Sequence, residues 1–105
     1  MTTIEILKKA RELLSDPARW CQNVSARSLE GKAVGYAAPT AFSFCMFGAI
    51  WNSAPRLSLI PDERVAAVFG LAADDLVEWN DAPERTHAEV LQRFDEAIAR
   101  LEAAG

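Results

Sequence analysis

The sequence predicts an α+β fold that is mainly helical, with about five helices around a central apolar helix and one β-hairpin. Apolar residues recur at helical spacing in several segments, and one central segment is apolar almost all round. Two short runs rich in β-branched and small residues separate the first two helical segments. The chain has 105 residues, of which 50% are hydrophobic and 25% charged. This composition is typical of one soluble globular domain, which we expect to span residues 1–105.

The first and last helices carry clear end signals. A helix is expected over residues 3–15, capped by Thr2 or Thr3, and it ends before Pro17 because the residue preceding proline avoids the helical region. Thr86 and Glu89 form a capping-box pattern that predicts the start of the last helix. The expected core face of that helix comprises Val90, Leu91, Phe94, Ala97, Ile98 and Leu101.

The central helix is expected over residues 40–53. A short helix that is apolar nearly all round packs on several sides, so Phe44, Phe47 and Ile50 should be among the most buried residues. Gly48 lies inside this segment at a cost of roughly 1 kcal/mol relative to alanine. We therefore predict that another stretch of backbone approaches Gly48 closely.

A β-hairpin is expected before the central helix. Its strands would cover residues 23–28 and 32–36, and Gly31 would supply the left-handed conformation of the turn. A hairpin of this size is marginal alone, so it must lie against the helices.

Two shorter helices are expected between residues 56 and 80. The first would begin at Pro61 and end at Gly70, since proline favours a first helical position and glycine a helix end. The second would cover residues 74–79 with an aspartate cap, burying Leu76 and Val77.

Charge and targeting signals narrow the function classes. The net charge is −4, with +2 in residues 1–35 and −6 in residues 36–105, which argues against a dedicated nucleic-acid-binding protein. An accessory nucleic-acid role would have to use Arg19, Arg27 and Lys32. The N-terminal segment lacks the features of a secretory signal, and no apolar run approaches the ~18–20 residues of a membrane span. We expect a cytoplasmic protein without a membrane partner.

The polar run from Trp79 to His87 is the candidate binding site. One hypothesis makes it a helix–helix connector, in which Asp81 accepts N–H bonds from residues 82–86 or pairs with Arg85. The other makes it a ligand pocket, with Asn80 and Asp81 orienting a polar ligand and Arg85 binding an anion. A partner-binding loop is the third possibility.

Catalytic and metal sites find little support. His87 is the only histidine, and Cys45 would be a nucleophile only if it lay near His87 and escaped burial, so we expect a core thiol. Cys21, Cys45 and His87 lack the spacing of a metal site, and the two thiols should stay reduced. No cofactor, metal or catalytic residue is therefore predicted. Trp20 is a further candidate for an aromatic pocket or a partner contact.

Three stretches together resemble a known family. They are residues 19–22 (Arg-Trp-Cys-Gln), residues 44–50 (Phe-Cys-Met-Phe-Gly-Ala-Ile) and residues 79–90, where Trp-Asn-Asp-Ala-Pro is followed by Arg-Thr-His-Ala-Glu-Val. This combination resembles a family of short bacterial and phage proteins that is a domain of unknown function. The resemblance covers nearly the whole chain and implies one domain, but it implies no activity.

The expected function is that of a small cytoplasmic, non-enzymatic module that binds a protein partner. The alternative is a small-ligand-binding or enzymatic site around Trp79, Asn80 and Asp81 with His87. A carboxylate that faces a cavity would favour the alternative, and an exposed apolar patch elsewhere would favour a protein partner.

Overall fold

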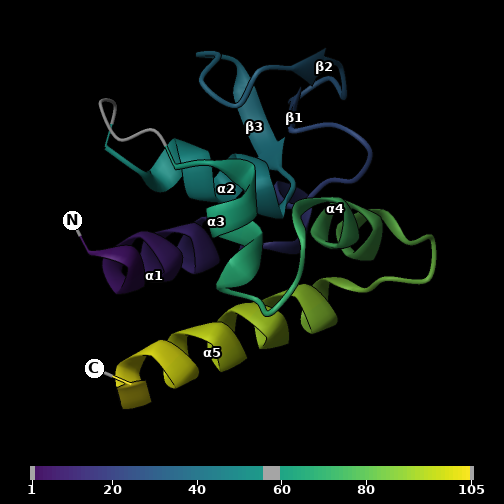
Figure 1. The fold of residues 1–105 in the computed structure, drawn as a ribbon. Helices are drawn as coiled ribbons and strands as arrows, with labels where there is room; N and C mark the ends of the chain where they lie inside the picture. The colour runs from purple at the N-terminus through teal and green to yellow at the C-terminus, as the bar shows by residue number, and fades with distance from the viewer. Residues whose placement is uncertain (1, 56–59, 105) are drawn as a thin grey trace.

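The computed structural model describes residues 2–55 and 60–104 and confirms a mixed, mainly helical fold (Figure 1). Helix α5 lies along the bottom of the view, α1 and α3 lie above it, and the strands lie at the top over α2. The elements are α1 (Thr3–Leu13), the 3-10 helix η1 (Pro17–Arg19), β1 (Ala26–Ser28), β2 (Ala33–Val34), β3 (Ala41–Phe44), α2 (Met46–Ser53), α3 (Asp62–Ala67), α4 (Ala73–Asp81) and α5 (His87–Ala104).

Helix α1 packs side by side with α5 and also packs against α2. Arg11 donates to both carboxylate oxygens of Asp95, at 2.9 and 3.2 Å, which links the two helices at the surface. The hydrophobic core forms between these helices and the sheet. Its completely buried large side chains are Leu7, Leu14, Met46, Leu76, Val90 and Phe94. Among the described residues, no helix combines the length and apolarity that crossing a membrane requires.

The predicted caps and turns are confirmed at several points. Thr2 and Glu5 form a capping box at the start of α1. Thr86 and Glu89 form one at α5, where the Glu89 amide donates to the Thr86 hydroxyl at 3.2 Å. Gly31 has a φ of 86° in the hairpin turn.

The central segment differs from the prediction. Residues 41–44 form strand β3, and helix α2 starts only at Met46. Strand β1 pairs antiparallel with both β2 and β3, so the expected hairpin gains a third strand on its other edge. A short, wholly apolar run has the same pattern in a buried strand and a buried helix, and the pairing edge of β1 decided between them. Phe44, Phe47 and Ile50 are nevertheless buried as predicted.

The two short helices form where predicted, but their bounds, the cap of α4 and the exposure of Val77 differ from the prediction. Helix α3 starts after Pro61, and Gly70 has a φ of 77° beyond its end. Helix α4 begins one residue before the predicted aspartate and runs to Asp81; Ala72, not an aspartate, precedes it as the cap. Leu76 is fully buried, but Val77 is 45% exposed. Since Leu76 and Asn80 lie four residues apart on the inward face of α4, Val77 is turned away from the core.

Candidate functional site

The side chain of Asn80 is buried and joins three parts of the chain. Its Oδ1 atom accepts hydrogen bonds from Trp20 Nε1 at 3.0 Å and from the Met46 amide at 3.2 Å. Its Nδ2 atom donates to the Cys21 carbonyl at 3.3 Å and to Asp81 Oδ1 at 2.8 Å. Met46 is the first residue of α2, so its amide has no partner within that helix. Asn80 therefore fixes the end of α4 to the start of α2 and to the segment after η1.

Asp81 extends this network, but with partners other than those predicted. Its Oδ1 atom also accepts from the Asn23 amide at 2.9 Å, and Asn23 has a positive φ of 73°. Gln22 Nε2 donates to the carbonyls of Asn80 and Ala82, both at 2.9 Å. The expectation that Asp81 binds residues 82–86 or Arg85 is therefore wrong. Hydrogen bonds made by Asn80 and Gln22 hold the segment of residues 20–23 against the end of α4. This places the Asn23 amide beside the Asp81 carboxylate.

The start of α2 approaches the neighbouring backbone closely. The Cys45 amide donates to the Ser25 carbonyl at 3.1 Å, and Cys45 Sγ accepts from the Gly48 amide at 3.3 Å. A Cβ atom on Gly48 would overlap the Ser25 carbonyl oxygen. The predicted close approach at Gly48 is thus confirmed, and the approaching backbone is that of Ser25.

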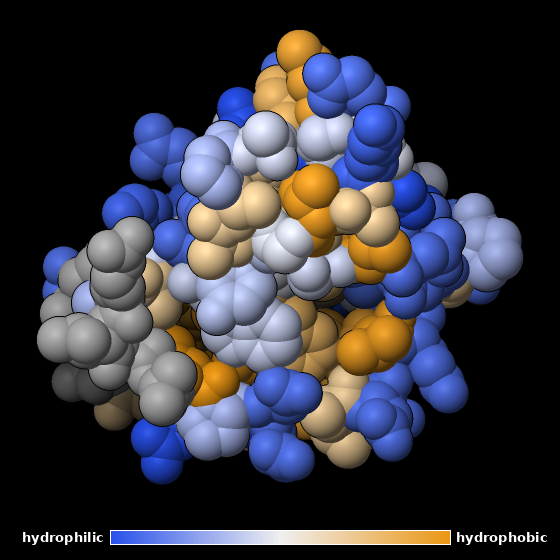
Figure 2. Space-filling view, turned by 90° about the horizontal axis from the view of Figure 1, so that it is seen from above, coloured by the Kyte–Doolittle hydropathy of each residue, from blue (hydrophilic) through white to orange (hydrophobic). Residues whose placement is uncertain are grey.

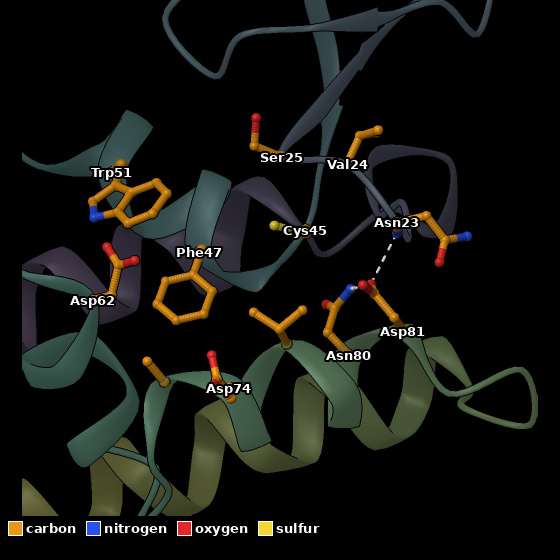
Figure 3. A pocket seen from close by; sticks show the side chains of 12 residues that line it. Asn23, Val24, Ser25, Cys45, Phe47, Trp51, Asp62, Asp74, Asn80 and Asp81 are labelled. Carbon is orange, nitrogen blue, oxygen red and sulfur yellow. Dashed lines mark hydrogen bonds between the residues drawn. The ribbon is translucent and has the colours of Figure 1, made fainter.

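A pocket of about 250 Å³ lies between these elements (Figure 3). The segment after η1 forms one wall, the start of α2 forms another, and α4 closes the opposite side. The volume is roughly eight times the ~30 Å³ that one water occupies in the liquid, which suits a ligand smaller than a drug-sized molecule. The lining residues are Asn23, Val24, Ser25, Cys45, Phe47, Trp51, Asp62, Ala73, Asp74, Val77, Asn80 and Asp81.

The walls of the pocket are largely apolar. Phe47 and Trp51 stack with ring centroids 5.1 Å apart, and Trp51 Nε1 donates to the Ile60 carbonyl at 3.1 Å, which fixes the indole. Val77 lies on α4 and is partly exposed at the pocket. The amide, hydroxyl and carboxylate side chains among the lining residues are those of Asn23, Ser25, Asp62, Asp74, Asn80 and Asp81.

The thiol that reaches the pocket is poorly suited to nucleophilic chemistry. Burial raises the pKa of Cys45 to about 11. Burial also raises the pKa of Cys21, and both cysteines are free thiols. At neutral pH almost all Cys45 is protonated, whereas the thiolate is the nucleophilic form. Cys45 is partly buried: it packs against the core and also lines the pocket.

The structure separates the predicted site residues into two groups. Asn80 and Asp81 line the pocket, and Trp20 reaches it indirectly through Asn80. Arg85 lies elsewhere, with its guanidinium carbon 3.9 Å from the centroid of the Trp79 ring and its Nε donating to the Trp79 carbonyl at 2.8 Å.

His87 also lies outside the pocket. Its Nε2 atom is 2.5 Å from the Leu14 carbonyl oxygen, and its ring is 6.5 Å from that of Trp20. The histidine therefore helps to hold α5 against the end of α1 and is not near Cys45 across the pocket.

Sequence reasoning missed several lining residues that share one face of α4. Asp74, Val77 and Asp81 are spaced at three and four residues, which is the spacing of one helix face. This periodicity was the available signal. Phe47 and Trp51 show the same four-residue spacing on α2, but nothing local indicates that the two faces meet.

No group of three or more metal-ligating side chains is found within residues 2–55 and 60–104. A family model described as "Family of unknown function (DUF6197)" matches residues 1–100 and confirms the expected resemblance to a domain family of unknown function. No curated protein and no solved structure matches the chain.

Proposed function

Since the chain belongs to the family of unknown function DUF6197, we propose its function from the geometry alone: it is a non-enzymatic binding module that takes up a small molecule in the pocket between α2 and α4. The single observation that carries this proposal is the preformed pocket itself, with an apolar wall and a carboxylate at its polar edge. Sites of this kind combine apolar surface with a few oriented polar groups.

Hydrogen bonds from three segments hold the pocket open in one shape. Asn80 is bonded to Cys21 and to the first turn of α2 by buried hydrogen bonds, and Asp81 is bonded to Asn23 by an exposed one, so the polar edge cannot collapse without breaking these bonds. Breaking such bonds costs about 1–3 kcal/mol for each buried group left without a partner. A site that is ordered before binding loses less conformational entropy when the ligand enters.

The chemistry of the lining supports binding in preference to catalysis. Cys45 has a pKa of about 11 and caps α2, so it serves the fold as a neutral group. His87 contacts Leu14 and does not line the pocket. A nucleophilic thiol needs a lowered pKa or a neighbouring base such as histidine; the pKa of Cys45 is raised, and no histidine is among the described lining residues.

Exposed apolar side chains lie partly at the pocket and partly elsewhere. The exposed large hydrophobic side chains among the described residues are Leu29, Tyr36 and Val77. Val77 lines the pocket, and Tyr36 packs on Trp51 with ring centroids 5.4 Å apart. Figure 2 shows the hydrophobic residues of the upper face in separate groups with hydrophilic residues between them. Apolar residues scattered over a surface need no binding role to explain them, so a protein partner stays a prediction. The cytoplasmic location also stays a prediction.

The test is a nuclear magnetic resonance screen of the isotope-labelled chain against a library of small-molecule fragments. We expect bound fragments to shift the amide signals of Asn23, Cys45 and Val77 together. Val77→Arg should abolish these shifts by filling the pocket from a partly exposed position, so the fold should survive. Glu78→Gln changes the net charge by the same amount on an exposed site outside the pocket and should leave binding intact.

The proposal fails if fragments shift signals only on another surface. It also fails if Val77→Arg binds them as well as the unaltered protein does.

A further inference from the structure

Resting on the proposed function, we infer that the pocket is built for a short linear aliphatic diamine, with one ammonium group at each end of an apolar chain. Three observations support this ligand class: the sign of the charges, their positions at two ends of the pocket, and the apolar surface between them.

All the charged side chains that line the pocket, among the described residues, are carboxylates. Asp62 comes from the start of α3, Asp74 from the first turn of α4 and Asp81 from its last residue. The ion pairs between described residues lie elsewhere. They join α1 to α5, or they join Arg85, in the loop before α5, to Glu89 in the first turn of α5. An apolar pocket edged by carboxylates alone favours a cation and repels an anion.

The carboxylates lie at opposite ends of the pocket. Figure 3 shows Asp62 and Asp74 on the side of Phe47 and Trp51, and Asp81 on the far side beside Asn23. Asp74 and Asp81 are seven residues apart on one helix, which places their Cα atoms about 10 Å apart along its axis at ~1.5 Å per residue. A single ion or a single ammonium group cannot contact both ends. A chain of a few methylene groups with two ammonium groups spans such a separation.

The space between the two ends is apolar. Val77 lies between Asp74 and Asp81 on α4, and Phe47, on which Trp51 stacks, forms the apolar wall beside Asp62 and Asp74 (Figure 3). Methylene groups are stabilised by burial against such surface. Aromatic rings also attract ammonium groups through their faces, so Phe47 and Trp51 favour the cation at the Asp62 and Asp74 end.

Asp81 is oriented for this role by bonds that leave part of its carboxylate free. Its Oδ1 atom accepts from Asn23 and Asn80, and both donors are held by the fold. The hydrogen bonds described for Asp81 all use Oδ1, which leaves Oδ2 for a ligand. Asp81 is thereby a binding residue placed by Asn80.

The experiment compares cadaverine with pentylamine, which has one ammonium group on the same carbon chain. Titrations followed by amide signals should show cadaverine binding about tenfold more tightly, as expected if the second ammonium contact is worth ~1.4 kcal/mol. Raising the salt concentration should weaken cadaverine more than pentylamine, because it screens two contacts.

Matched variants locate the two ends. Asp74→Asn should weaken cadaverine about tenfold, to the level of pentylamine. Asp75→Asn removes the same charge from the next residue of the same helix turn, outside the pocket, and should change little. Asp81→Asn should weaken cadaverine as Asp74→Asn does, so either variant tests the proposal if the other fails to fold.

Equal binding of cadaverine and pentylamine, or cadaverine binding that ignores both Asp74→Asn and Asp81→Asn, would overturn the diamine. If uncharged fragments still fill the pocket and Val77→Arg excludes them, the binding module stands and only the ligand class is wrong. If Val77→Arg has no effect on any probe, the proposed function itself fails.

Discussion

Two polar corners of the molecule, the first at Asn80 and Asp81 and the second at residues 85–89, lie only a few residues apart in the sequence. Their hydrogen bonds nevertheless reach different parts of the chain. The side chains of Asn80 and Asp81 bind Trp20, Cys21 and Asn23, about sixty residues earlier in the chain. The side chains at the start of α5 bind their own neighbourhood: Thr86 and Glu89 exchange hydrogen bonds, and Arg85 holds Trp79 and Glu89.

The difference separates two uses of polar residues. The first corner holds distant segments together in a buried place, so its loss leaves donors without partners in the interior. The second corner completes one helix end at the surface, where water can replace a missing partner. The pocket adjoins the first corner, where three segments meet around polar groups. The predictions below test this contrast, starting with the largest expected effect.

Asn80→Ala should cost roughly 3 kcal/mol or more of the free energy of unfolding. The buried donors of Trp20 and Met46 would lose their acceptor, and each unsatisfied group costs about 1–3 kcal/mol. Chemical denaturation measures the change. Asn52→Ala is the matched control, because exposed Asn52 makes a hydrogen bond to the Tyr36 carbonyl and should cost far less. Equal losses in the two variants would refute the assignment of Asn80 as the link between segments.

Gly48→Ala should destabilise the fold by about 1–3 kcal/mol through overpacking. The added methyl group would overlap the Ser25 carbonyl, which is backbone and cannot rotate away. Gly35→Ala is the control, because no heavy atom lies within 4 Å of a Cβ placed there. Thermal melts of the two variants should therefore differ clearly. A Gly48→Ala protein as stable as the unaltered one would mean that α2 does not press on Ser25.

Thr86→Ala should cost about 1 kcal/mol, the usual value of a lost N-cap. Hydrogen bonds from Thr86 lower the pKa of Glu89 below its ordinary value. The bond from the Thr86 backbone has the larger effect, and the bond from its side chain the smaller one. A lowered carboxylate pKa stabilises the fold above the unfolded pKa, and this contribution is lost as pH falls through the folded pKa. The stability difference between variant and unaltered protein should therefore narrow in acid. Thr3→Ala, at an exposed helical position, is the comparison.

Cys45→Ser should have the smallest effect near neutral pH, under about 1 kcal/mol, because serine is itself a good N-cap residue. The pH profile distinguishes the two proteins. Burial raises the folded pKa of Cys45 from 9.0 to about 11, so the thiol favours the fold below pH 9 and that contribution disappears as pH rises toward 11. Unfolding curves at increasing pH should show a steeper loss with Cys45 than with Cys45→Ser. Parallel profiles would contradict the burial of this thiol.

The same contrast explains which features of the structure could be predicted from the sequence. The capping box at Thr86, the helix cap expected at Thr2 or Thr3 and the turn at Gly31 depend on residues within a few positions of each other. The box and the turn are confirmed, and the cap is at Thr2. The partners of Asp81 were predicted wrongly because only the folded chain brings Asn23 to it. Residues 41–44 were assigned to a helix for a similar reason: strand β1 supplies the pairing edge from another part of the sequence.

About half of the candidate site was predicted from the sequence. Asn80 and Asp81 were identified because amide and carboxylate side chains stand together near the end of a helix. Arg85 and His87 were grouped with them by sequence proximity, but the chain turns after Asp81 and carries both to other surroundings. Phe47 was expected among the most buried residues, and only the packing of α2 opposite α4 makes Phe47 and Trp51 a pocket wall.

The pairing of α1 with α5 has a consequence for how the protein folds. Arg11 meets Asp95 and Lys8 meets Glu102, so segments more than eighty residues apart must find each other before the core is closed. Phe94, which is completely buried, lies on α5. Before α5 docks, Leu7 and Leu14 of the α1 region have no cover from α5 and expose apolar surface of the kind that drives aggregation. Contacts of such long range also slow folding relative to a bundle of neighbouring helices. The docking of α5 on α1 is therefore the step that closes the core.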